Sequence, residues 1–320
     1  MANWQAEWKW DGIRAQLIHR AGQHFIWSRG EDLITHQFPE FAEPLQQLPD
    51  GTVLDGEIVC WDGQRHLNFN YLQKRLGRKR VGPKLMAENP VHFLAYDLLE
   101  HQGQDIRKTP LHHRRQLLTT LLATHKPPYI SYSQLMDFDT FEQLQSLRSQ
   151  ARDHQAEGLM LKALDSEYLV GRKRGSWWKY KVDPMTLDGV LIYAQAGSGK
   201  RANLFTDYTF ALWHGEELVP FAKAYSGLAN QEITTLDKWI RRHTRERFGP
   251  VRSVEPTHVF EIGFEGIAQS KRHKSGISVR FPRILRWRHD KPIAEADSLE
   301  AAFALLSAND SSALPAQSTS

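Results

Sequence analysis

Cysteine is almost absent from this 320-residue sequence, in which Cys60 stands alone. One cysteine excludes a disulfide framework and a thiolate metal cluster. Long hydrophobic runs are also missing, because no apolar stretch approaches the ~20 residues that cross a bilayer. Residues 1–11 are aromatic and charged, and they lack the apolar core of a secretory signal peptide. These absences favour a cytoplasmic protein.

The overall composition is that of an ordinary folded protein. Hydrophobic residues make up 41% of the chain and charged residues 24%. A chain of this length exceeds one small core, so we expect two domains. The formal net charge is +4, and 15 histidines add positive charge below neutral pH. This balance is compatible with a polyanionic partner.

The stretch Glu7–Arg14 predicts a short strand that runs into a turn. Its two tryptophans alternate with charged residues, so the two sets should face opposite sides of the strand. Lys9 is a candidate nucleophile, because a lysine beside apolar walls or other cations loses its ammonium form more readily. A solvated lysine on an exposed strand is the alternative that these residues leave open.

Hydrophobic periodicity divides residues 15–181 into strands and helices. We expect a hairpin, further strands and three helices. The hairpin arms are 15–19 and 24–28, the strands are 52–60, 91–99, 157–162 and one ending at 177–181, and the helices are 38–48, 111–122 and 138–151.

Residues 70–84 are rich in basic side chains and almost free of acid. A run of this kind is either a solvated face or a contact for a phosphate backbone, and the sequence leaves both open. The basic residues are Lys74, Arg75, Arg78, Lys79, Arg80 and Lys84.

The pattern changes to short strands after Asp183 and Pro184. Strands are expected at 189–195, 207–213, 218–225, 259–268 and 277–287, with a helix at 230–248. This combination predicts a small barrel of the oligonucleotide-binding (OB) type. The end of the chain is rich in Ser, Ala, Pro and Thr, which predicts disorder. The expected domains are therefore 1–184 and 185–305, followed by a disordered tail at 306–320.

Charged residues interrupt apolar strands or stand at strand ends in several places. A set with both signs implies one shared polar cleft. Lysine and arginine bind phosphates, and two separated glutamates without a histidine or cysteine cluster suit a hard cation such as Mg²⁺. One lysine then remains as the nucleophile. The set is Lys9, Asp11, Arg14, Arg29, Glu57, Glu157, Lys179 and Lys181.

The motifs of the chain, taken in order, resemble those of ATP-dependent DNA ligases. This family belongs to the covalent nucleotidyltransferase superfamily, which also contains RNA ligases and mRNA capping enzymes. Residues 72–78 further resemble bacterial ligases that are encoded beside an exonuclease and a helicase. The motifs are K-x-D-G-x-R at 9–14, S-R at 28–29, D-G-E at 55–57, an aromatic motif ending at 96–97, E-G-L-M-L-K at 157–162, W-x-K-x-K at 177–181 and R-F-P-R-x-x-R-x-R-x-D-K at 280–291.

The resemblance implies a fold and an activity. The fold is α+β, with an ATP-grasp-like nucleotidyltransferase domain of antiparallel sheets and flanking helices before a C-terminal OB-fold barrel. Lys9 would attack the α-phosphate of ATP and become a lysyl-adenylate. AMP would pass to the 5′-phosphate at a nick in duplex DNA, where the 3′-hydroxyl displaces it, in repair or recombination.

The same resemblance implies the cofactors and partners. ATP would be the adenylate donor, and Mg²⁺ or Mn²⁺ the metal. The partners would be nicked double-stranded DNA and an exonuclease and a helicase of the same pathway. We expect a monomer in the bacterial cytoplasm, associated with the nucleoid through DNA.

The resemblance also assigns residues around the nucleotide. Glu7 would contact the adenine, and Tyr96 would stack on it. Arg14, Arg29 and Glu57 would hold the ribose or the phosphate at the nick. An ordinary core position is the alternative for Tyr96.

Further charged residues would act on the metal and the phosphates. Glu157, together with Glu57, would bind the metal ion. Lys179 and Lys181 would contact the α-phosphate and offset the charge that grows on it in the transition state. The barrel would close over the triphosphate about a hinge at 183–187 and then swing away to grip DNA. The barrel residues in this role are Arg286, Arg288, Asp290 and Lys291.

Other interpretations stay open. RNA end joining or capping is the alternative within the superfamily, although the R-F-P-R motif and the basic residues 70–84 favour a DNA ligase. A nucleotide- or DNA-binding remnant without sealing activity is the alternative from another class. Ligases of this family carry more chain before the first motif, so we expect a truncated core. Lys162 fits a structural role as well as phosphate binding.

Overall fold

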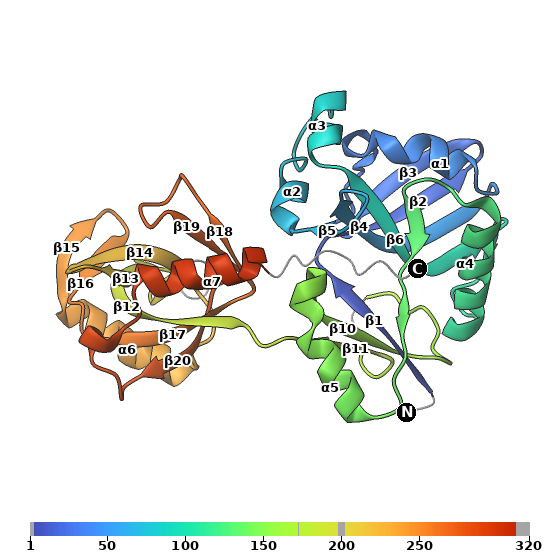
Figure 1. The fold of residues 1–320 in the computed structure, drawn as a ribbon. Coiled ribbons are helices and arrows are strands. Elements are labelled where there is room, and N and C mark those ends of the chain that lie inside the picture. The colour runs from blue at the N-terminus through green and yellow to red at the C-terminus, as the bar shows by residue number, and fades with distance from the viewer. Residues whose placement is uncertain (1–2, 172, 198–201, 312–320) are drawn as a thin grey trace. The chain divides into compact units, whose positions relative to one another are not determined.

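The computed structural model describes residues 3–171, 173–197 and 202–311. The chain divides into two compact units, with the division after Val182, close to the expected boundary (Figure 1). Each unit has its own hydrophobic core. No helix among the described residues combines the length and the apolar character needed to cross a bilayer.

The described part of the first unit is built on two sheets. In the larger sheet the order is β3-β2-β4-β6-β7, with β5 on β4 and β8 parallel to β6. Its strands are β2 (Ile13–Arg20), β3 (Gln23–Ser28), β4 (Thr52–Trp61), β5 (His66–Leu67), β6 (Val91–His101), β7 (Gln104–Asp105) and β8 (Ile130–Tyr132). The smaller sheet has the order β11-β10-β1-β9. Its strands are β1 (Trp4–Trp10), β9 (Leu135–Met136), β10 (Ala156–Ala163) and β11 (Trp177–Lys181).

Helices cover one face of each sheet. Leu17, Leu54 and Phe93 of the larger sheet are fully buried in a cluster with Leu45 and Leu118, which belong to α1 (Ala42–Gln46) and α4 (Leu111–His125). Because side chains alternate along a strand, the opposite face is left for the polar residues of β2 and β4. The smaller sheet packs against α5 (Phe141–Ser149) in the same way (Figure 1). The other short helices of this unit are η1 (Thr35–Gln37), η2 (Pro39–Phe41), α2 (Phe69–Gln73), α3 (Pro83–Glu88) and η3 (Ala151–His154).

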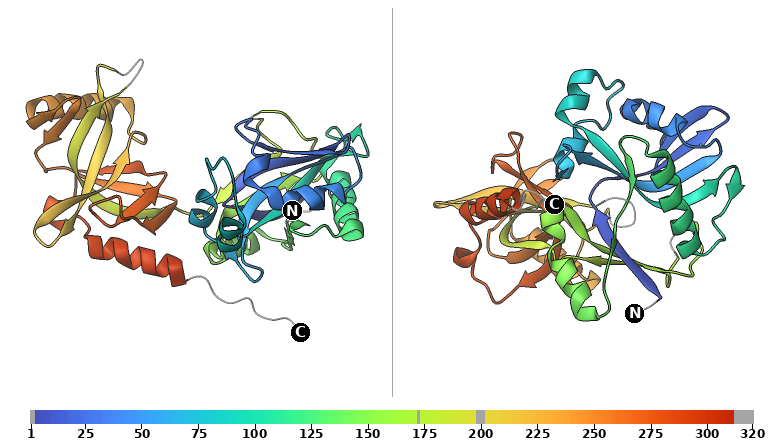
Figure 2. Two further views of the ribbon diagram at one scale, coloured as in Figure 1. Left: turned by 90° about the horizontal axis from the view of Figure 1, so that it is seen from above. Right: turned by 45° about the vertical axis from the view of Figure 1, so that its right-hand side comes forward.

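The second unit is an OB-fold barrel with packed helices. Strand β12 pairs with β13, β16 and β17, and β20 pairs with β17. Helix α7 lies beside β13 and β18 (Figure 2). The elements are β12 (Met185–Ala196), β13 (Phe205–His214), β14 (Glu217–Ala224), α6 (Asn230–Arg242), β15 (Thr244–Phe248), β16 (Val251–Val254), β17 (Val259–Phe264), β18 (Gly266–Gln269), β19 (Ile277–Arg280), β20 (Arg283–Arg288), η5 (Ile293–Glu295) and α7 (Leu299–Ser311).

The prediction of one helix over 230–248 is wrong in its second part. Helix α6 buries Ile233, Leu236 and Ile240, which follow the helical spacing, and it ends at Arg242. Residues 244–248 form β15 instead, which pairs with β16. The alternation of polar and basic residues in this stretch suits a strand at the sheet edge better than a helical face.

The prediction of disorder from residue 306 is also wrong in its first part. Helix α7 continues to Ser311, while residues 312–320 lie outside the described residues. Leu299, Ala302 and Leu306 are buried in the barrel core. Their spacing of three and four residues gives the helix one apolar face, and its burial stabilises the helix.

The basic residues 70–84 do not behave as one group. Arg75 is completely buried, pairs with Glu40 at 2.6 Å and donates to the carbonyl oxygen of Asn89. Arg75 therefore holds α2 and α3 to the body of the domain and cannot contact DNA. The remaining basic residues are all exposed, so a solvated face and a contact for a phosphate backbone both stay open for them.

Candidate active site

Lys9 lies where the pairing of β1 with β10 is irregular. The register shifts between Trp8 and Trp10, so Glu157 and Gly158 together lie opposite Lys9 alone. Such a β-bulge turns side chains away from the regular strand direction. Here it brings the two charged residues into contact, because Nζ of Lys9 donates to Oε2 of Glu157. Both side chains are largely buried.

Gly158 is required by this bulge. Its φ is +138°, and a Cβ atom on it would lie 2.3 Å from the carbonyl oxygen of Tyr180 and 2.6 Å from Cα of Lys181. The backbone of β11 therefore approaches β10 too closely for any side chain at this position. The close approach also places Lys181 beside Glu157, at 3.8 Å between Nζ and Oε2.

Strand β11 adds further positive charge to the site. Burial, together with the positive charges of Lys9, Arg29 and Lys181, holds the pKa of Lys179 below its ordinary value. The structure thus brings together four cations that the sequence predicted for one cleft. The cations of such a cluster repel one another, and phosphate is an anion that lysine and arginine bind well, so a phosphate would be favoured among them.

The larger sheet contributes a carboxyl group to the same place. Removal from water raises the pKa of Glu57 to about 8, although the nearby charges of Lys9 and Arg14 oppose this shift. Glu57 forms no hydrogen bond or ion pair with the described residues. Glu57 is therefore available to a cation or to a ligand hydroxyl.

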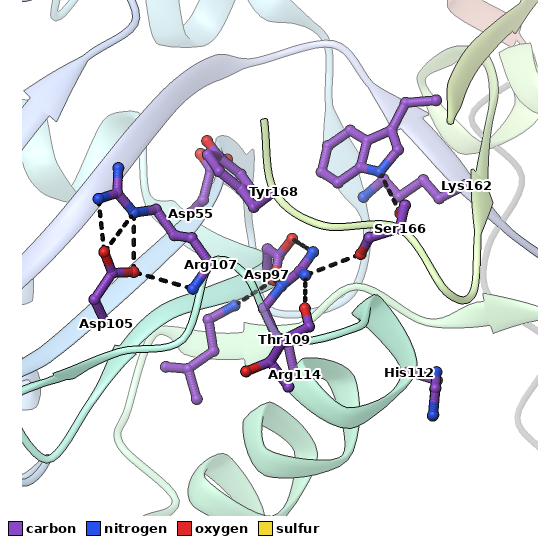
Figure 3. A network of polar contacts seen from close by, with 12 residues as sticks. Asp55, Asp97, Asp105, Arg107, Thr109, His112, Arg114, Lys162, Ser166 and Tyr168 are labelled. Atoms are coloured by element: carbon purple, nitrogen blue, oxygen red, sulfur yellow. Dashed lines mark hydrogen bonds and ion pairs between the residues drawn. The ribbon is translucent and has the colours of Figure 1, made fainter. Parts of the chain in front are cut away.

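Arg14 lies at the mouth of an open groove on the same face. Its guanidinium donates to Asp55 at 2.7 Å and to the hydroxyl of Tyr168 at 3.0 Å. The Tyr168 hydroxyl in turn donates to Asp55 at 2.7 Å, and the two residues lie side by side (Figure 3). The groove has a volume of about 880 Å³ and extends from Arg14 to Arg107. The sequence did not predict Asp55 or Tyr168 as site residues. Asp55 was noted only as the first residue of the D-G-E motif.

Glu7 lies on the same face of β1 as Lys9 and is almost completely buried. Its Oε1 accepts from Nζ of Lys162, and Nζ lies 4.3 Å from the ring centres of both Tyr96 and Trp177. The Oε2 atom of Glu7 is buried without a hydrogen-bond partner. Lys162 therefore forms an ion pair with the carboxylate of Glu7. It does not belong to the group of cations that would meet a phosphate. Trp177 was visible in the sequence only as the first residue of a motif.

A second buried ion pair connects the elements that carry the site. Arg114 donates to both carboxylate oxygens of Asp97, at 2.8 and 2.9 Å, and both side chains are fully buried. Arg114 also donates to the carbonyl oxygens of Thr109 and Ser166 (Figure 3). The network ties β6 and α4 to the segment after β10.

The predicted barrel residues form a network within the second unit. Asp188 accepts from Arg288 at 2.8 Å and from Lys291 at 2.7 Å. Arg288 also pairs with Asp290 at 2.8 Å. Arg286, which is exposed, lies 3.4 Å from Glu261. Asp188 was missed by the sequence because it stands in an apolar strand 100 residues before Arg288.

The donor set fits a magnesium ion only in part. No group of three metal-ligating side chains gathers among the described residues. Glu157 contacts Lys9, and Glu57 lies within electrostatic range of the same lysine. One or two carboxylates are what the protein supplies where substrate phosphates and water complete the octahedron of Mg²⁺.

Comparison with known proteins identifies the family. A sequence model of the ATP dependent DNA ligase domain matches residues 1–181, and a model of the ATP dependent DNA ligase C terminal region matches residues 201–291. The chain belongs to the ATP-dependent DNA ligase family. The matched ranges of this ligase family contain the site residues described above except Asp188, which lies between the two ranges.

Two relatives show how far the ligase resemblance extends. A probable DNA ligase of Koribacter versatilis is 40% identical over 315 residues, which cover 92% of this chain and 55% of that protein. A DNA ligase of Natronomonas pharaonis is 34% identical over 296 residues, covering 92% of this chain and 53% of that protein. The chain thus spans about half the length of these curated relatives.

A solved structure of a Lig E DNA ligase has the same fold. Its TM-score is 0.62 at 19% identity, and the match covers 90% of this chain and 93% of that one. At this level of identity the likeness concerns the fold alone. It agrees with a nucleotidyltransferase domain followed by an OB-fold domain.

Proposed function

We propose that this chain is an ATP-dependent DNA ligase that seals nicks in duplex DNA through a lysyl-adenylate on Lys9. The observation that carries the proposal is the contact of Lys9 with Glu157 inside a cluster of further cations. A solvated lysine on an exposed strand would have neither the bulge nor the surrounding charge. Family membership supports the same chemistry.

In the first step the amine nitrogen of Lys9 attacks the α-phosphorus of ATP. A nitrogen–phosphorus bond forms, the bond from the α-phosphorus to the bridging oxygen breaks, and pyrophosphate leaves. The attacking nitrogen must first lose a proton. Glu157 is placed to receive it, because its Oε2 accepts from Nζ of Lys9.

The charge that develops on the α-phosphate meets the lysines of β11. Lys179 and Lys181 would stabilise it without reorganising, because their strand is fixed by the close approach at Gly158. Glu57 would hold a magnesium ion together with oxygens of the nucleotide, and Glu157 would join it in its ionised form, once the proton from Lys9 has passed to solvent. Such an ion supplies further charge neutralisation at the phosphates.

The base and the sugar would lie along β1 and the larger sheet. Glu7 and Lys9 are two residues apart on one face, so their Cα atoms are about 7 Å apart. This spacing places a base at Glu7 while the α-phosphate is at Lys9. Tyr96 would stack on the base, and Arg14 and Arg29 would hold the ribose or the 5′-phosphate of the nick.

The barrel residues would act on the triphosphate. Arg288 and Lys291 now share the carboxylate of Asp188, so they must exchange Asp188 for phosphate oxygens when they engage ATP. Arg286 is exposed and lies 3.4 Å from Glu261, so leaving this contact for a phosphate oxygen would cost less free energy. A hinge at residues 183–187, a monomeric state, a role in repair or recombination, and an exonuclease and a helicase as partners stay predictions from the resemblance.

The substrate is tested with a 5′-³²P-labelled strand in matched nicked duplexes. We expect sealing of nicked DNA in the presence of ATP and Mg²⁺, and at most slow sealing of nicked RNA. Faster sealing of the RNA duplex would move the chain to RNA end joining. Protein that is labelled by ATP but seals neither duplex would contradict the ligase proposal.

A further inference from the structure

The ion pair between Glu7 and Lys162 is held in place by burial, by strand pairing and by two aromatic rings. Both side chains are 1% exposed. Lys162 lies directly opposite Trp177 in the pairing of β10 with β11, and its ammonium is near the faces of both Trp177 and Tyr96. Trp177 is held in turn, because its Nε1 donates to Oγ of Ser166 at 3.2 Å. Cation–π contacts of this kind strengthen when they are desolvated.

The pair leaves one oxygen of Glu7 unused. Oε1 accepts from Lys162, whereas Oε2 is buried without a partner. A buried acceptor without a donor costs free energy that a ligand donor restores. The exocyclic amine of adenine is such a donor, and a base at this point would meet Tyr96 as well.

We propose that Lys162 determines the choice of base, because it takes Oε1 of Glu7 and leaves Oε2 as the acceptor for the 6-amino group of adenine. This inference rests on the proposed function. Lys162 is thereby a positioning residue that acts through Glu7 and does not itself touch the nucleotide.

In Glu7→Gln, Lys162 should fix the orientation of the new amide. An ammonium group has only donors, so the amide oxygen of the glutamine must face Lys162. The amide nitrogen, also a donor, then faces position 6 of the base. It repels the amine of adenine and attracts the 6-oxo group of hypoxanthine.

The experiment measures kcat/KM for self-adenylation with ATP and for the corresponding inosylation with ITP. We expect Glu7→Gln to lower the ATP-to-ITP ratio by about 100-fold or more. In Glu7→Gln/Lys162→Met the amide is free to rotate, so the ratio should recover at least about tenfold toward ATP. Lys108→Met, which changes an exposed lysine of the same domain, should keep the wild-type ratio.

Two results would overturn the inference. If Glu7→Gln keeps the wild-type ratio, Oε2 does not read the base. If the double variant has the same ratio as Glu7→Gln, Lys162 does not orient the side chain. A merely structural role for Lys162 would lower both rates together and leave the ratio unchanged.

A binding measurement applies also to variants that react too slowly for kinetics or that unfold at a lower temperature. The rise in thermal unfolding temperature is compared at matched ATP and ITP concentrations for the wild type and Glu7→Gln. Preference of Glu7→Gln for ITP supports the inference, and undiminished preference for ATP contradicts it. Failure of the folded wild type to react with ATP would overturn the proposed function as well, whereas an unchanged ratio in an active protein overturns the inference alone.

Discussion

Lys9 meets Glu157 across a β-bulge in which two residues of β10 lie opposite one residue of β1. The bulge explains why a lysine in a strand can point at a carboxylate that regular pairing would direct elsewhere. It also explains why the residue after Glu157 is glycine. The proposed nucleophile and its proposed proton acceptor are thus positioned by backbone geometry, which single substitutions can test.

Gly158→Ala should disable the site although it replaces no charged residue. The new Cβ would lie 2.3 Å from the carbonyl oxygen of Tyr180, so β11 must move away from β10. We expect self-adenylation with ATP to fall by about 100-fold or more, since displacement of catalytic groups by about 1 Å has effects of this size. Rates are measured by radiolabel transfer to protein. Gly82→Ala is the control, because nothing lies within 4 Å of its added Cβ and its φ is negative.

Glu57 should make the fold less stable as the pH rises. Its pKa is about 8 in the folded chain against 4.5 for an ordinary glutamate, so the folded state binds more protons between these values. The free energy of unfolding therefore decreases as the pH rises from 4.5 to 8, because the contribution of the neutral carboxyl is lost. Glu57→Gln should gain on the order of 1–4 kcal/mol at pH 9 relative to the wild type, and nothing at pH 4. Urea unfolding without Mg²⁺ measures this difference, and a gain that is the same at both pH values would contradict the assignment.

Two partly buried histidines should make the fold sensitive to acid. Burial lowers the pKa of both His66 and His92 to about 4, from 6.5. The unfolded chain therefore binds more protons between these values, and stability falls as the pH drops from 6.5 to 4. His92→Gln can keep the hydrogen bond to Ser131 and should reduce this loss by on the order of 1–3 kcal/mol. Thermal unfolding of both proteins across this pH range checks the prediction.

Arg75 and its basic neighbours should separate into structural and surface residues. Arg75→Met leaves Glu40 buried without its partner and should cost about 3–5 kcal/mol of stability. Arg75→Met/Glu40→Gln should recover much of that loss. Lys79→Ala, at an exposed position, should leave stability unchanged. If Lys79 contacts a phosphate, the same substitution reduces by about one the slope of log K for DNA binding against the logarithm of the salt concentration. An equal loss of stability at both positions would contradict the division.

Much of this arrangement follows from local sequence patterns. Alternation along β1 and β4 and the spacing of α4 fix which faces are apolar, so the strands that carry Lys9, Glu57 and Lys181 were predictable. The pairing of Glu7 with Lys162 was not, because it depends on the register in which Gln5 lies opposite Lys162. No local pattern reports the register of strands that are distant in the chain.

The missed features have a similar cause. The burial of Arg75 depends on Glu40, and the sharing of Asp188 by Arg288 and Lys291 depends on strands that meet in the barrel. A charged residue that is buried with a distant partner has the same local pattern as one in solvent. Helix α6 ended earlier than expected because the pairing of β15 with β16 overrides the local preference of a basic segment.

The covalent role of Lys9 is tested most directly by mass spectrometry. The purified protein is incubated with ATP and Mg²⁺, digested and mapped. We predict a gain of one AMP on the peptide that contains Lys9, and no gain in Lys9→Ala, while Lys108→Met reacts like the wild type. A folded wild-type protein that gains no AMP, or an adenylated Lys9→Ala, would contradict the account.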